Sequence, residues 1–333
     1  MPFTLPDHVD VRPETLLEIA YRYSVGGGSV ERLPETGIFN AIYRLGDGAI
    51  LRIPRDHPKF VEAARNEALA VPAARAAGVR TPRLLAFDDS LELLPVPYTV
   101  YERVPGQPLE SLELDPADAA EVWRDHGRNL ALAHVGVPVA GRITCLPEKT
   151  ADPDPRGLLA ERVAEGWLSP LDARWLGLWL DRLAPAALEP TPLRFLHGDT
   201  QATNLMVSTR PLAYEAIIDW GSAALGDTAL DFAGVPLRAV PFMLAGHREV
   251  APLDGDATAE ARILWRHLQL SIWTLPRGAV AGLSWGERPI PMLLEVLRCF
   301  LDPLDDRWHG LGPIEAGIAA MGAPAASRRG SHA

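Results

Sequence analysis

Three oxygen-bearing side chains in the second half of the chain have the types and spacing that phosphoryl transfer from a nucleotide requires. Asp199 lies in the segment His-Gly-Asp-Thr-Gln-Ala-Thr-Asn, Asn204 ends that segment, and Asp219 follows an apolar run. Phosphoryl transfer needs one carboxylate to accept the proton of the attacking hydroxyl, and oxygen ligands to hold magnesium on the phosphates. Asp199 fits the first role. Asn204 and Asp219 fit the second, because magnesium prefers oxygen ligands and keeps several waters.

The two motifs together resemble the aminoglycoside phosphotransferase family, which is related to the protein kinases. In that family the catalytic loop reads His-Gly-Asp with an asparagine five residues after the aspartate, as in residues 197–204. A later Ile-Asp-Trp, here residues 218–220, corresponds to the Asp-Phe-Gly of protein kinases. The resemblance implies ATP and Mg²⁺ as cofactors, and a structural role for His197 beneath the loop.

Other interpretations of these motifs stay open. Gly-Asp alone often forms a turn, and an asparagine before an apolar run often caps the backbone, but their pairing at this spacing favours catalysis. A metal-dependent phosphoester hydrolase would use His197, Asp199 and Asp219 as ligands, and leaves the features of the N-terminal part unexplained. A non-catalytic nucleotide-binding module is the third alternative.

The elements that must position these residues begin with an antiparallel sheet. Extended runs joined by turn signals, including Gly46-Asp47-Gly48, predict strands at residues 30–33, 40–45, 49–53, 81–87 and 98–104. Helical patterns precede and interrupt the sheet, at residues 13–23 and 59–78. Pro72 is expected to kink the second helix or to stop it early.

The resemblance assigns nucleotide-binding residues to this sheet. Arg52 occupies the position at which most relatives have a lysine on the α- and β-phosphates; arginine keeps the charge but differs in geometry. Glu67 is the candidate partner that orients Arg52, with a solvated position as the alternative. Asn40 follows the loop expected over the phosphates, and the adenine is expected to bond to backbone groups near Tyr101 and Arg103.

These features predict an α+β, two-lobed, protein-kinase-like fold. An N-lobe with an antiparallel sheet and one or two helices is expected over residues 1–104, a mostly helical C-lobe over residues 105–322, and a disordered tail over residues 323–333. A chain of 333 residues exceeds the usual single core. The Leu-Arg-Ile-Pro-Arg segment, residues 51–55, is also similar to macrolide phosphotransferases.

Local signals in the C-lobe support this organisation. Asp115 and Ser169, each followed by proline, predict the capped starts of two helices. By the same resemblance, Asp227 and Asp231 are expected to anchor the catalytic loop and cap the next helix.

Composition limits the partners. The net charge is −11, and residues 105–333 carry 29 acidic against 20 basic side chains. This balance disfavours nucleic acid and membrane surfaces and would attract a cationic small molecule; alternatively, the surplus acid only keeps the surface dispersed. No long apolar stretch or leader-like start is present, so the cytoplasm is expected. Cys145 and Cys299 lack metal or redox spacing and are expected to be reduced.

The acceptor is expected to be a hydroxyl of a small molecule, with an aminoglycoside or other antibiotic as the first candidate and a sugar, amino alcohol or macrolide as alternatives. Helices near residues 238–248, 256–275, 289–301 and 314–321 are expected to form its wall. Acids beside aromatics suit an amino sugar, whereas an apolar, tryptophan-rich wall suits a larger neutral acceptor. The wall residues are Asp254, Asp256, Glu260, Glu287, Glu295, Asp302, Asp305, Asp306, Trp265, Trp273 and Trp285.

Overall fold

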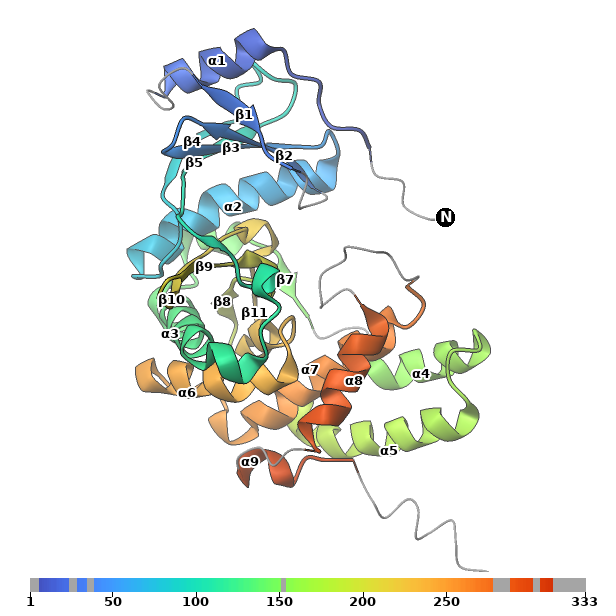
Figure 1. Ribbon diagram of the computed structural model, residues 1–333. Helices are drawn as coiled ribbons and strands as arrows, with labels where there is room; N and C mark the ends of the chain where they lie inside the picture. The colour runs from blue at the N-terminus through green and yellow to red at the C-terminus, as the bar shows by residue number, and fades with distance from the viewer. Residues whose placement is uncertain are drawn as a thin grey trace, which may run out of the picture.

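Five strands form an antiparallel sheet in the N-terminal part of the computed structural model (Figure 1). The spatial order of the strands is β1-β2-β3-β5-β4. Every second side chain of the second strand is buried, because successive side chains of a strand point to opposite faces of the sheet. The strands are β1 (Val30–Arg32), β2 (Asn40–Leu45), β3 (Ala49–Pro54), β4 (Leu84–Asp88) and β5 (Tyr98–Glu102).

Two helices cover opposite faces of this sheet (Figure 1): α1 (Pro13–Arg22) and α2 (Pro58–Ala76). Buried residues of α1 join the core of the sheet, whereas Ala70, Val71 and Ala74 of α2 belong to the core of the helical part below. The early stop predicted at Pro72 does not occur. Proline removes one backbone hydrogen bond, but the buried face of α2 continues through it to Ala74.

The chain passes from this sheet to a second one within a few residues. It leaves β5 at Glu102 and reaches β6 (Gln107–Pro108), which pairs with β9 (Leu205–Thr209); β9 in turn forms a hairpin with β10 (Leu212–Ile217). A third small sheet contains β7 (Glu148–Lys149), parallel to β11 (Ala224–Gly226), which is antiparallel to β8 (Arg194–Leu196). These short strands carry the polar segments singled out above.

Helices build most of the remaining structure (Figure 1). Asp115 caps as predicted by accepting the N–H of Ala117, but a 3-10 turn follows and the α-helix begins later than expected, at Ala120. Ser169 also caps as predicted. The helices are α3 (Ala120–Gly136), α4 (Pro155–Ala164), α5 (Pro170–Ala187), α6 (Val240–Val250), α7 (Ala259–Thr274), α8 (Pro289–Cys299) and α9 (Asp306–His309).

The structure describes residues 6–23, 29–34, 39–150, 154–277, 288–301 and 306–313. Within them, an antiparallel sheet followed by a mostly helical part confirms the expected α+β class. No helix among these residues has the length and apolar character needed to cross a membrane. The tail at 323–333, the helix expected at 314–321 and four residues of the expected acceptor wall lie outside the described residues: Trp285, Glu287, Asp302 and Asp305.

Candidate active site

The His-Gly-Asp loop, residues 197–204, begins where β8 ends and depends on a glycine. Gly198 has a φ of +80°, and a Cβ at this position would lie 2.0 Å from the carbonyl oxygen of Ser222. No other residue type fits there without moving the backbone. The buried carboxylate of Asp231 accepts the backbone N–H groups of His197 and Gly198, at 2.8 and 2.7 Å, so the start of the loop is fixed.

The ring of His197 lies beneath this loop and links it to the segment after β10. Its Nδ1 accepts the backbone N–H of Asp199 at 3.2 Å, and its Nε2 lies 3.0 Å from the carbonyl oxygen of Ile218. A neutral imidazole with its proton on Nε2 satisfies both contacts. Burial lowers the pKa of His197, which favours this neutral form.

Asp199 is held by side chains of its own loop. Gln201 donates to Oδ1 at 2.7 Å, while the Asn204 amide donates to Oδ2 at 3.2 Å and to the Asp199 carbonyl oxygen at 2.8 Å. Burial raises the pKa of Asp199, and the charge of Asp219 acts in the same direction. The carboxylate is therefore both fixed in position and more basic than a solvated one.

The β9–β10 hairpin brings the other two oxygen-bearing residues together. Asn204 immediately precedes β9 and Asp219 follows β10, whose register pairs Leu205 with Ile217. The N–H of Ile218 also donates to the carbonyl oxygen of Asn204 at 2.9 Å. Because the start of one hairpin strand faces the end of the other, residues fifteen positions apart become neighbours.

Asp219 faces the N-terminal sheet through Arg52. The Arg52 guanidinium lies 2.9 Å from Oδ2 of Asp219 and 2.5 Å from Oε1 of Glu67. Burial would raise the pKa of Asp219, but the charge and hydrogen bond of Arg52 outweigh it and lower that pKa. Burial raises the pKa of Glu67 to about 7 despite Arg52. The predicted Arg52–Glu67 contact is thus present and extends to the second motif.

The remaining predicted nucleotide residues lie at different distances from this cluster. Tyr101 is buried, and burial raises the pKa of its hydroxyl. The nearby charge of Glu67 raises this pKa further, whereas the charge of Arg52 lowers it. Arg103 donates its backbone N–H to Gly48 at 2.9 Å, so this N–H already has a partner. Asn40 begins β2 opposite Pro54, at the end of the sheet where β3 leaves it. Among the described residues, Asn40 forms no hydrogen bond or ion pair with Arg52, Glu67 or Asp219.

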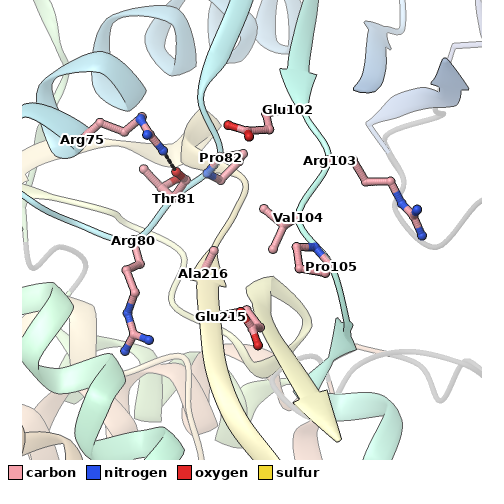
Figure 2. Close-up of a pocket in the computed structure, with 10 residues that line it drawn as sticks. All are labelled: Arg75, Arg80, Thr81, Pro82, Glu102, Arg103, Val104, Pro105, Glu215 and Ala216. Carbon is pink, nitrogen blue, oxygen red and sulfur yellow. Dashed lines mark hydrogen bonds between the residues drawn. The ribbon is translucent and has the colours of Figure 1, made fainter. Parts of the chain in front are cut away.

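Behind the linker of residues 103–106 lies a cavity of about 240 Å³ that is separate from this cluster (Figure 2). Its lining comes from the end of α2, the segment between α2 and β4, the end of β5, the linker and β10. Of the predicted site residues only Arg103 takes part, and Figure 2 shows its side chain pointing away from the other lining residues. Arg75, Arg80, Thr81, Pro82, Glu102, Arg103, Val104, Pro105, Glu215 and Ala216 line the cavity.

One basic residue of the site was missed by the sequence reasoning. Lys149 donates from Nζ to the carbonyl oxygen of Gly198 at 2.6 Å, and its charge lowers the pKa of Asp199 against the effect of burial. The contact arises because β7 pairs with β11, beside β8. The only sequence signal was that Lys149 is one of two lysines among 32 basic residues.

The donor set suits a hard cation that keeps most of its water. No cluster of three or more His, Cys, Asp or Glu side chains able to hold a metal is found in the described ranges. The Asn204 side-chain nitrogen donates hydrogen bonds to Asp199. The side-chain oxygen of Asn204, Oδ1, therefore remains for a cation. One amide oxygen and the Asp219 carboxylate, which is 35% exposed, match the few protein ligands that Mg²⁺ takes beside phosphates.

Comparisons with known proteins give a family model and a set of related folds. A model described as the phosphotransferase enzyme family matches residues 30–268. The GDP complex of wild-type aminoglycoside 2'-phosphotransferase-IIIa is 18% identical, with a TM-score of 0.62, and the match covers 86% of this chain and 98% of that chain.

Two structures with other substrates in their names are also similar. Macrolide 2'-phosphotransferase MphH from Brachybacterium faecium is 22% identical, with a TM-score of 0.54 and coverage of 81% and 95%. A choline/ethanolamine kinase family protein from Mesorhizobium loti is 16% identical, with a TM-score of 0.55 and coverage of 89% and 98%. At these identities the likeness concerns the fold, and the expected kinase-like fold is confirmed.

Proposed function

The chain belongs to the phosphotransferase enzyme family, and from that premise we propose that it transfers the γ-phosphate of ATP to a hydroxyl of a small molecule. The observation that carries this proposal is one connected cluster. Glu67 contacts Arg52, Arg52 contacts Asp219, and the hairpin links Asp219 to the Asn204–Asp199 pair. Catalysis of this reaction consists almost entirely of such positioning and charge placement.

Each residue of the cluster has a role in this proposal. Asp199 accepts the proton of the attacking hydroxyl, and its raised pKa makes it a better base. Asn204 and Asp219 hold Mg²⁺, which when bound neutralises charge on the phosphates. Arg52, oriented by Glu67, binds the phosphates further from the transferred group.

Three further residues surround the proposed nucleotide. Asn40 begins β2 and would lie near the phosphates, whereas Tyr101 and Arg103 would lie near the adenine. Because the N–H of Arg103 is already bonded to Gly48, its neighbours in the linker must supply the adenine contacts. The choice between ATP and GTP is tested by running both nucleotides in parallel.

Replacing Arg52 with alanine is expected to raise the KM for ATP by about 10- to 100-fold, because a hydrogen-bonded charge on the phosphates is lost. Steady-state kinetics with varied ATP would measure this. Arg52→Lys is the matched control, since it keeps the charge but not the fork geometry, and should retain more affinity. An unchanged KM in Arg52→Ala would assign the phosphate contact to another basic group, with Arg55 as the next candidate.

Replacing Lys149 with methionine is expected to lower kcat about 10-fold, because the carbonyl of Gly198 loses a charged donor that helps to fix the His-Gly-Asp loop. Lys149→Arg should recover part of the rate. Lys59→Met, on the exposed side of α2, is the control for losing a lysine. If both methionine variants keep the wild-type kcat, Lys149 has no part in the reaction.

The acceptor is constrained by the buried acids of the expected acceptor wall. Glu260 and Glu295 are almost fully buried. Arg248 donates to Glu260 at 2.7 Å, and Arg238 donates to Glu295 at 2.9 Å. These carboxylates are therefore neutralised within the protein and do not face an acceptor.

The more exposed acids of the wall are also paired. Asp254 forms an ion pair with Arg194 at 2.6 Å, and Asp256 pairs with Arg307 at 3.0 Å. Asp306 is exposed and has no arginine partner among the described residues, but its Oδ1 lies 3.7 Å from Nδ1 of His309. Because most of its described acids form ion pairs with arginines, the wall offers little negative charge to a polycationic aminoglycoside. We therefore place neutral alcohols, such as sugars or macrolides, before aminoglycosides as the acceptor class.

An ADP-release assay with magnesium-ATP tests both levels of this proposal. Aminoglycosides, macrolides, sugars and amino alcohols would be added separately, with ATP binding followed by calorimetry. Stimulation by a neutral alcohol supports the acceptor class, whereas stimulation only by aminoglycosides overturns that class but keeps the phosphotransferase. Absence of both ADP release and nucleotide binding would contradict the proposed function.

A further inference from the structure

Two buried histidines meet beneath the His-Gly-Asp loop because α3 and α6 approach each other closely. A Cβ on Gly127 of α3 would lie 1.9 Å from a backbone oxygen of α6, and a Cβ on Gly246 of α6 would lie 1.9 Å from a backbone oxygen of α3. This contact places Nδ1 of His134 3.1 Å from Nε2 of His247. Both residues are only 1% exposed.

The outer nitrogens of this histidine pair also have partners. Nδ1 of His247 lies 2.8 Å from the carbonyl oxygen of Ala251, and Nε2 of His134 lies 3.0 Å from Oδ2 of Asp231. Asp231 is fully buried, and its carboxylate is the group that accepts the first two N–H groups of the His-Gly-Asp loop. An unbroken row of contacts therefore runs from α6 to the loop.

The number of protons in this row follows from hydrogen-bond chemistry. Each of the three contacts needs one hydrogen between its two heavy atoms, so the row needs three. The Ala251 carbonyl can only accept, and it fixes one hydrogen on Nδ1 of His247. Two neutral imidazoles carry two hydrogens in total. The third must be an additional proton, because without it two acceptors would face each other in a site closed to water.

We propose that His134 is an imidazolium, protonated on both ring nitrogens, and that its buried ion pair with Asp231 makes it a positioning residue for the His-Gly-Asp loop. His247 is then neutral, with its proton on Nδ1 and its Nε2 accepting from His134. All three contacts are satisfied, and the charge of Asp231 is compensated. A buried carboxylate without such a partner would be costly.

The environment of the pair agrees with this assignment. Burial would raise the pKa of Asp231, but the hydrogen bond and charge of His134 lower it to about 2. Burial lowers the pKa of His247 to about 3, so it is the neutral member. Five other charged or titratable groups interact electrostatically with the row. They are His126 of α3, Arg248 of α6, His197 in the loop after β8, and Asp254 and Asp256 in the segment after α6.

The ion pair acts on the proposed reaction through the backbone. Asp231 holds the N–H groups of His197 and Gly198, and the next residue is Asp199. If His134 were neutral and lacked its Nε2 proton, the Asp231 carboxylate would turn away or take up a proton, and the loop would lose a fixed anchor. This consequence rests on the proposed function, whereas the protonation of His134 does not.

Nitrogen-15 NMR of the full chain, labelled at histidine, tests the protonation directly. We expect both ring nitrogens of His134 to carry protons in the folded protein, as the three contacts of the row require. His247 should be protonated on Nδ1 alone. Burial lowers the pKa of His126, on the same helix, to about 3, so it is a neutral internal reference. A His134 ring with one unprotonated nitrogen at neutral pH would overturn the proposal.

Kinetics of His134→Gln test the positioning role. Glutamine can still donate to Asp231 but carries no charge, so kcat should fall about 10- to 100-fold while the KM for ATP changes little. His126→Gln places the same amide on the same buried helix and should keep most of the wild-type rate. Equal losses in the two variants would remove the positioning role. If the wild-type protein shows no phosphotransferase activity but its His134 is doubly protonated, the proposed function is contradicted and the protonation of His134 is not.

Discussion

Asp199→Asn is expected to lower kcat by about a thousandfold while leaving the affinity for magnesium-ATP nearly unchanged, because general-base catalysis of this kind contributes 10²–10⁴-fold. The substitution keeps the shape of the side chain and removes only its charge and basicity. Gln201 and the Asn204 amide both donate to this carboxylate, so an amide there can also disturb the loop. Steady-state kinetics and calorimetry on the same preparation separate the two effects.

Asp118→Asn, an exposed aspartate in the turn before α3, is the matched control and should behave as wild type. A kcat for Asp199→Asn within a few-fold of the control would remove Asp199 from the proton-transfer step. A large loss of ATP affinity in Asp199→Asn, with little change in kcat, would move Asp199 from catalysis to nucleotide binding.

Asp219→Ala is expected to weaken the binding of magnesium-ATP by about 10- to 100-fold or more, since losing even an indirect metal partner has effects of this size. The expected result depends on the metal. With a chelator present, ATP should bind the variant as well as the wild type or better, because a carboxylate that repels phosphate is gone and Arg52 is released from it. Calorimetric titrations with and without Mg²⁺ would measure both.

Equal losses of ATP affinity with and without Mg²⁺ would show that Asp219 acts by orienting Arg52 and not as a metal ligand. Glu67→Gln helps to separate these roles, because it changes the other partner of Arg52 but leaves the proposed ligand in place. It should weaken ATP binding to a similar extent in both conditions.

The sequence predicted the features of the site that depend on local geometry. The spacing from Asp199 to Asn204 fits within one short loop, and a hairpin turns the chain so that Asp219 returns beside Asn204. The contact of Arg52 with Glu67 was expected from the family resemblance, with a solvated Glu67 as the alternative, and the contact is present. Such arrangements can be predicted from the sequence because few residues separate the partners.

The features that sequence reasoning missed depend on contacts between distant segments. Lys149 reaches Gly198 only because a two-residue strand pairs in parallel with β11. His134 meets His247 only because glycines on two helices allow their backbones to touch. Pro72 was expected to kink α2 or to stop it early, and the early stop does not occur because packing of α2 against the helical part overrides local propensity.

In the proposed reaction Asp199 directs the γ-phosphate to an acceptor hydroxyl, so the fate of that phosphate should be measured. ATP labelled in its γ-phosphate would be incubated with the protein, Mg²⁺ and the acceptor that stimulates ADP release, and the products would be separated by mass. Labelled phosphate should appear on the acceptor in an amount that matches the ADP formed, and almost none should appear there with Asp199→Asn. Label released mainly as free phosphate, at rates independent of the acceptor, would contradict the proposed reaction and indicate a hydrolase.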